Sequence, residues 1–112
     1  MTRQAELAFF SITRLAALVR KKKVSPVELL DAVLARIERL NPRLNAFITV
    51  AADSARAEAK RAEREIARGR WRGPLHGIPI SLKDNIATSG IRTTAGSKIL
   101  AENIPDQDAT VV

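Results

Sequence analysis

Residues 77–86 read GIPISLKDNI, and the alternation inside this stretch decides the fold expected for the chain. Apolar residues take every second position from 78 to 82, and a period of two is typical of a β-strand. Pro79 has no N–H to donate to a neighbouring strand, so it belongs near the start of such a strand. The stretch therefore predicts a strand over residues 78–83, with Lys83 on the face opposite the two isoleucines.

Lys83 at the end of this predicted strand has two interpretations. On a solvated edge it is an ordinary surface charge. If an apolar strand carries it inward, burial favours the neutral amine, and a neutral amine can serve as the general base beside a serine nucleophile. Lys83 is therefore the candidate catalytic residue, whereas Asp84 and Asn85 fit a turn better than acid–base chemistry.

Upstream of this stretch, apolar residues recur with helical spacing in three segments. The first covers residues 11–23, the second begins at residue 26, and the third covers residues 52–68 with a shallow stripe made mostly of alanine. Between the second and third segments, AFITVA at residues 46–51 fits a strand or an extended connector. The sequence predicts a mainly helical part over residues 1–70, followed by a different kind of structure from residue 71.

The second helical segment has the clearest start and stop signals. Ser25 fits the N-cap and Glu28 the third helical position, which is the pattern of a capping box, and proline suits the first turn. Pro42 disfavours a helical conformation at the preceding residue, so the helix is expected to end there. The apolar face is expected to consist of Val27, Leu30, Leu34 and Ile37, flanked by Val33 and Leu40.

Composition limits the classes of protein to consider. The 112 residues form one domain at most, contain no cysteine and carry a net charge of +7. Without cysteine, disulfides, thiolate metal sites and cysteine nucleophiles are excluded. No apolar run approaches the roughly 20 residues of a membrane span, and no signal peptide begins the chain. We therefore expect a soluble, cytoplasmic protein with no membrane partner.

The positive charge leaves a second class of function open. Arg20–Lys23 is the one dense basic run, and arginines recur at positions 68, 70 and 72. A basic helical module that binds nucleic acid without enzyme activity is thus an alternative. However, cations in the last turn of a helix also complement its dipole, and the remaining charges alternate in sign. We expect no nucleic-acid partner for this segment.

Three features near the predicted strand have ordinary explanations. His76 is the only histidine and has no neighbouring ligand residues in the sequence, so neither a triad nor a metal role is expected. Trp71 fits a packing lid at a helix end. TTAGS, residues 93–97, is a loop that can be an ordinary connection, although its backbone amides could also contact a substrate.

The final PDQDATVV starts like a helix but stops within about one turn, which is too short to offset helix nucleation. We therefore expect the chain to be a fragment.

The chain resembles the amidase signature family. The resemblance rests on GPLHGIPISLKDNI, TTAGSKIL and DATVV in that order, with SPVELLDAVLARIERLNPRLNAFITV upstream. Within that family it looks most like the A subunit of tRNA-dependent amidotransferases and related bacterial amidases. The resemblance implies a truncated α/β fold: a helical N-terminal segment, then the first strand or strands of a large mixed sheet, so that residues 71–112 begin the α/β core.

The family resemblance also implies a chemistry. The family cleaves carboxamides with a Ser–Ser–Lys triad, whose lysine matches Lys83, while both serines lie in a Gly/Ser-rich segment that this sequence does not contain. Ser97 matches neither serine. The resemblance implies a small carboxamide substrate, no metal or organic cofactor, and partner subunits if the protein is an amidotransferase; a homo-oligomer is left open. The 112 residues alone are expected to be inactive.

Overall fold

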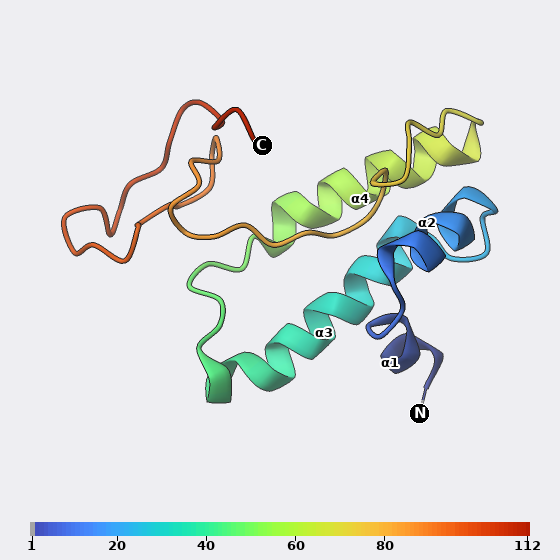
Figure 1. Cartoon of the computed structure of the whole chain (residues 1–112), viewed down its shortest axis with the longest axis horizontal. Coiled ribbons are helices and arrows are strands. Elements are labelled where there is room, and N and C mark those ends of the chain that lie inside the picture. Colours follow the sequence, from blue (N-terminus) through green and yellow to red (C-terminus); the bar gives the residue numbers. More distant parts are fainter. Residues whose placement is uncertain (1) are drawn as a thin grey trace. The chain divides into compact units, whose positions relative to one another are not determined.

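A computed structural model describes residues 2–112, which divide into two compact units. The first unit runs to Phe47 and resumes at Ala52–Pro79, and the second joins Ile48–Ala51 to Ile80–Val112. The first unit holds the helices of the described chain (Figure 1). They are α1 (Arg3–Leu7), α2 (Ile12–Arg20), α3 (Pro26–Leu44) and α4 (Ala52–Ala67). The three longer helices confirm the segments predicted from apolar spacing.

Side-chain caps fix where three of these helices begin, at Thr2 for α1, Ser11 for α2 and Ser25 for α3. The Ser11 hydroxyl accepts a hydrogen bond from the Arg14 N–H at 3.2 Å, and the Ser25 hydroxyl accepts one from the Glu28 N–H at 3.0 Å. Each cap satisfies a backbone donor that has no partner inside its helix, which is worth about 1 kcal/mol. The predicted start of α3 at Pro26 is thereby confirmed.

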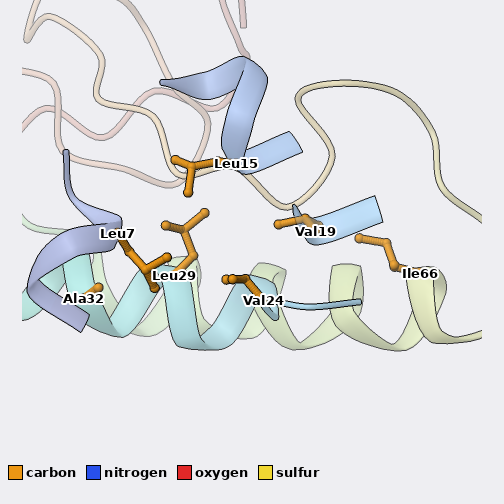
Figure 2. Packing of buried hydrophobic residues seen from close by; sticks show 7 residues of the cluster. All are labelled: Leu7, Leu15, Val19, Val24, Leu29, Ala32 and Ile66. Atoms are coloured by element: carbon orange, nitrogen blue, oxygen red, sulfur yellow. The ribbon is translucent and has the colours of Figure 1, made fainter. Parts of the chain in front are cut away.

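The core of the helical unit forms around α3, against which α4 and α1 pack, while α2 adds Leu15 and Val19 to the buried cluster. Val19 and Leu29 are its most completely buried large side chains, and Ile66 of α4 closes the cluster near Val19 (Figure 2). The buried face of α3 is rotated from the predicted one: Leu29 and Ala32 are buried, whereas most of the predicted face is only half-buried. Apolar residues run almost all the way round this part of α3, so periodicity alone could not choose the side that faces the cluster.

The predicted end of α3 at Pro42 is wrong, because the helix continues through Pro42 to Leu44. Pro42 removes one helical hydrogen bond and crowds the carbonyl four residues earlier, but only Arg43 and Leu44 lie beyond it in the helix. The helix ends instead at Asn45, whose left-handed backbone (φ 48°, ψ 38°) directs its N–H to the Asn41 carbonyl. The Asn41 side chain also bonds both backbone groups of Phe47, at 2.9 and 3.1 Å.

Residues 46–51, for which the sequence allowed a strand or an extended connector, form a connector and not a strand.

The strand predicted over residues 78–83 does not form. Within residues 2–112, the only β-pairing is an isolated bridge between Thr88 and Ile91, so no mixed sheet is present. A strand needs a neighbour for its N–H and C=O groups, and residues 78–83 have an alternating sequence but no adjacent strand to pair with. The alternation suits an extended segment, but the partner that makes such a segment a strand is absent from the described chain.

The second unit is organised by backbone hydrogen bonds between two irregular segments. Residues 87–93 lie against residues 103–109: Ala109 N–H donates to the Ala87 carbonyl at 2.8 Å, Gly90 N–H to Pro105 at 3.0 Å, and Thr93 N–H to Asn103 at 2.9 Å. The bonds are too widely spaced to form a ladder, but they hold the segments at three points. The unit is therefore an ordered loop structure even without a strand.

Gly77 lies where the chain passes the start of α3. A Cβ added at Gly77 would lie 2.6 Å from Pro26 Cγ and 3.1 Å from Pro26 Cβ, and φ of Gly77 is +81°. Gly69 has almost the same φ, +80°, but nothing lies within 4 Å of the corresponding position. The two glycines therefore share the backbone requirement and differ in packing.

We predict that Gly77→Ala destabilises the protein more than Gly69→Ala. Both substitutions place a Cβ in the left-handed region, at about 1–2 kcal/mol, but only Gly77→Ala also overpacks against proline, at about 1–3 kcal/mol more. Urea unfolding followed by helical circular dichroism measures the difference. Equal midpoints for the two variants would contradict the close packing of Gly77 on Pro26.

Candidate functional site

The candidate catalytic residue, Lys83, lies at the start of a turn in the second unit. Its carbonyl accepts a hydrogen bond from the Ile86 N–H at 3.0 Å, with Asp84 and Asn85 between them, so both residues take the turn role predicted for them. The Lys83 side chain is exposed. The neighbouring Ile80 and Leu82 are exposed as well, at 69% and 39%. The inward placement expected for Lys83 therefore does not occur in this chain by itself.

The residue after the lysine is held by the TTAGS loop. Asp84 Oδ1 accepts from the Thr94 N–H at 2.9 Å, and Oδ2 accepts from the Thr94 hydroxyl. The Asp84 carbonyl accepts from the Ala95 N–H at 2.8 Å. These three bonds, here called the Asp84–Thr94 clamp, fix the backbone immediately after Lys83. They join two of the motifs that carry the family resemblance, GPLHGIPISLKDNI and TTAGSKIL, and no pattern in the sequence indicates these bonds.

The clamp favours the ionised form of Asp84. Hydrogen bonding from the Thr94 hydroxyl, and then from the Thr94 N–H, lowers the pKa of the Asp84 carboxyl below its usual 3.8, because both donors stabilise the carboxylate. The positive charge of Arg92 also lowers the pKa of Asp84, whereas partial burial of the carboxyl raises it. Asp84 is therefore a permanent acceptor near neutral pH and is unsuited to proton transfer there.

The backbone amides of TTAGS already have acceptors within the second unit. Thr93 donates to the Asn103 carbonyl, Thr94 and Ala95 to Asp84, Gly96 to the Thr94 hydroxyl at 3.2 Å, and Ser97 to the Thr94 carbonyl at 2.9 Å. A substrate carbonyl would have to displace one of these acceptors. These bonds stabilise the loop itself, so they favour an ordinary connection over the contact between its amides and a substrate that the sequence left open.

Arg92 and Asn103 hold the loop from its other side. The Arg92 guanidinium donates to the Ala101 carbonyl and lies 3.5 Å from the Thr49 hydroxyl. The Asn103 amide donates to the Thr93 carbonyl at 2.9 Å, so Asn103 and Thr93 exchange two hydrogen bonds. The clamp and these contacts make the polypeptide around Lys83 well determined, although the lysine side chain itself reaches solvent.

His76 is buried in the helical unit, which its loop position in the sequence did not indicate. Its side chain is 4% exposed, Nδ1 accepts from the Arg72 N–H at 2.9 Å, and Nε2 lies 2.9 Å from Glu65 Oε2. With Nδ1 as an acceptor, a neutral imidazole carries its proton on Nε2, facing the carboxylate. The Arg72 guanidinium lies 3.0 Å from the same oxygen. His76 thus ties the turn before Gly77 to the last turn of α4.

Three other features of the described residues complete this description. Residues 2–112 contain no cluster of three or more histidine or acidic side chains arranged to hold a metal ion. None of their helices is both long and apolar enough to cross a bilayer. Trp71 packs half-buried against the helical core, as predicted for a lid at the end of a helix.

Comparison with known families identifies the class of protein. The family model described as Amidase matches residues 28–112, which include α4, most of α3, Lys83 and the Asp84–Thr94 clamp. The match covers most of the chain, so the chain belongs to the amidase family. This confirms the resemblance drawn from the motifs around Lys83.

Individual relatives narrow the comparison. The chain is similar to the glutamyl-tRNA(Gln) amidotransferase A subunit of Geobacter sulfurreducens, with 50% identity over 107 residues. It is 46% identical to the protein of that name from Anaeromyxobacter dehalogenans and 42% identical to that of Carboxydothermus hydrogenoformans. Each alignment covers 96% of this chain but 22% of the relative. The chain therefore spans about a fifth of the length of these relatives.

We predict that the Asp84–Thr94 clamp is lost in acid, and that the pH at which it is lost is set by the hydrogen bond from the Thr94 hydroxyl. Because the pKa of Asp84 is lowered in the folded chain, the clamp is fully stabilising above pH 3.8 and is lost as the pH falls through the lower, folded value. The chemical shift of the Thr94 amide proton in an NMR titration reports this protonation directly.

Two variants of Thr94 provide the control. Thr94→Val removes the hydroxyl at nearly constant volume and should move the midpoint up toward 3.8, whereas Thr94→Ser keeps the hydroxyl and should leave it low. The amide proton of Arg14, at the start of α2, should show no chemical-shift transition with this midpoint in any of the three proteins. A midpoint at or above 3.8 in the parent protein would show that the clamp does not hold the carboxylate.

Proposed function

We propose that this chain contributes the catalytic lysine, Lys83, to an amidase that cleaves a carboxamide through an acyl-serine intermediate. The observation that carries the proposal is the family match over residues 28–112, which includes the Lys83-Asp84-Asn85 motif. The Asp84–Thr94 clamp supports it, because it fixes the backbone beside the lysine and joins two separate parts of the matching sequence. The two serines of the Ser–Ser–Lys triad are contributed by residues outside this chain.

The proposed chemistry explains why a lysine is required. A serine hydroxyl is a weak nucleophile at neutral pH and needs a base to take its proton. The neutral amine of Lys83 takes this proton through the bridging serine as the nucleophilic serine attacks the amide carbon. Returning a proton to the leaving nitrogen releases the amine or ammonia and leaves an acyl-serine, which water then hydrolyses. No metal or organic cofactor takes part in this scheme.

The proposal requires that the lysine be shielded from water during the reaction, because burial favours the neutral amine. In this chain Lys83 is exposed, but the exposed Ile80 and Leu82 beside it supply apolar surface that further parts of an amidase domain can cover. Each buried aliphatic side chain contributes about 1.5–3 kcal/mol. A neighbouring strand supplied by those parts would pair with residues 78–83 and so form the predicted strand within a mixed sheet.

The relatives support a more specific form of the proposal, in which the complete protein is the A subunit of a tRNA-dependent amidotransferase. All the relatives named above are glutamyl-tRNA(Gln) amidotransferase A subunits. In this form the carboxamide is that of glutamine, and the ammonia passes to a partner protein. The alternative is a free amidase that acts on another small carboxamide. Ammonia release from glutamine, compared with release from simple carboxamides, separates the two.

We predict that Lys83→Ala in the complete enzyme lowers kcat by about 10²–10⁴-fold, since a general base acts in the transition state. Lys98→Ala is the matched control, because Lys98 is an exposed lysine of the same unit that lies outside the Lys83-Asp84-Asn85 motif. Circular dichroism checks that both variants fold. Activity of Lys83→Ala within about tenfold of the parent would remove Lys83 from the mechanism.

We predict that the 112-residue chain by itself shows no amide turnover, because it lacks the serine pair that Lys83 would serve. It should also self-associate or remain partly disordered, since Ile99 is 94% exposed and Ile80, Ile104 and Val111 are largely exposed. Sizing chromatography and an ammonia-release assay test the two parts. Turnover that disappears in Lys83→Ala would overturn the first part, and a cooperatively melting monomer would overturn the second.

A further inference from the structure

Two basic segments that are far apart in the sequence meet at one end of the helical unit. One is Arg20–Lys23, which begins with the last residue of α2, and the other carries the arginines at 68, 70 and 72 after α4. Together these seven residues are called the basic face, and all are exposed. The Lys22 ammonium donates to the Ala67 carbonyl at 3.4 Å, and the Arg20 guanidinium lies 4.4 Å from the centre of the Trp71 ring. Figure 1 shows that the loop after α2 and the end of α4 lie at the same end of this unit.

The packing of the core explains why the segments meet. Val19 in the last turns of α2 and Ile66 in the last turn of α4 belong to one buried cluster (Figure 2). Both helices therefore end at the same place. Lys22 adopts a left-handed backbone, φ 60°, as the chain turns back toward α3. The sequence shows both basic segments but not that they meet, so it leaves nucleic-acid binding as an alternative only.

Helix dipoles account for only part of the charge in the basic face. Each helix C-terminus carries roughly half a negative charge, so the ends of α2 and α4 together offset about one cation. Glu65 offsets another through its contact with Arg72. Of the seven cations, about five positive charges remain in excess, which is more than the helix ends require.

We propose that the basic face binds the phosphate backbone of a nucleic acid. Arginine presents a planar fork of donors that matches phosphate oxygens, and lysine adds point charges beside it. A membrane surface is the other large polyanion, but helices that bind at its interface also insert apolar side chains. Trp71 is half-buried against the core, and Leu75, 64% exposed, is the nearest large exposed hydrophobic residue along the described chain, so the basic face has no cluster of such residues to insert. The chemistry fits phosphates without lipid insertion.

The proposal does not depend on the amidase assignment, since the basic face lies in the helical unit and Lys83 in the other. The test uses the complete protein and measures fluorescence anisotropy of labelled RNA and DNA hairpins over a series of salt concentrations. Lys21→Glu/Arg68→Glu changes one residue from each segment and avoids Lys22 and Arg20, which make contacts within the fold. We expect this variant to bind at least about tenfold more weakly and to lose about two units of salt slope.

Arg39→Glu/Arg43→Glu is the control with the same change in net charge. Both arginines are exposed in the last two turns of α3, about 20 Å along the helix from its start beside the basic face. At a Debye length of about 10 Å their charges are screened from the basic face. We expect this variant to bind either hairpin within about threefold of the parent. RNA and DNA should both bind, because phosphates are common to them.

Three results would overturn the proposal. The first is an absence of binding to either hairpin at low salt. The second is an equal loss of affinity in both double variants, which would reduce the effect to net charge. The third is binding to vesicles of phosphatidylserine and phosphatidylcholine, with the same dependence on Lys21 and Arg68, while both hairpins fail to bind. Amidase activity unchanged in Lys21→Glu/Arg68→Glu would further separate this site from the catalytic one.

Discussion

Gly77 has no side chain, and this allows the backbone to pass close to the start of α3 before it reaches the segment that carries Lys83. Pro26 is both the first residue of α3 and the surface against which the Gly77 backbone packs, so the Ser25 cap and this close approach occur at one place. On the other side, His76 is fixed to Glu65 of α4. Residues 76 and 77 are therefore held between the start of one helix and the end of another. The chain leaves the helical unit only two residues later, at Pro79.

The helices could be predicted from the sequence because their signals are local. Ser11 and Ser25 each cap a backbone N–H three residues away, and apolar spacing follows from the geometry of a single helix. Errors arose where a second element decides the outcome. Leu29 is buried because Leu7 of α1 and Leu15 of α2 belong to the same cluster, and α3 continues past Pro42 to a left-handed cap at Asn45. Propensity at one position does not contain that information.

The candidate site was less predictable because it depends on pairing between distant residues. The alternation around Lys83 indicates an extended segment, but a strand also needs a neighbour, and none is present in the described chain. Asp84 and Thr94 are ten positions apart in a loop with no periodicity, so their clamp left no signal in the pattern. His76 shows the same limitation, since its burial comes from Glu65 and Arg72. The family resemblance points to the lysine motif, but it does not indicate these contacts.

The position of Trp71 gives the protein a built-in optical probe. The sequence contains one tryptophan and no tyrosine, so nearly all intrinsic fluorescence comes from this residue. Its ring packs against the helical core and lies under the Arg20 guanidinium. The emission spectrum therefore reports melting of the helical unit and is insensitive to unfolding confined to residues 80–112. An anion that draws Arg20 off the ring would change the emission intensity without any label.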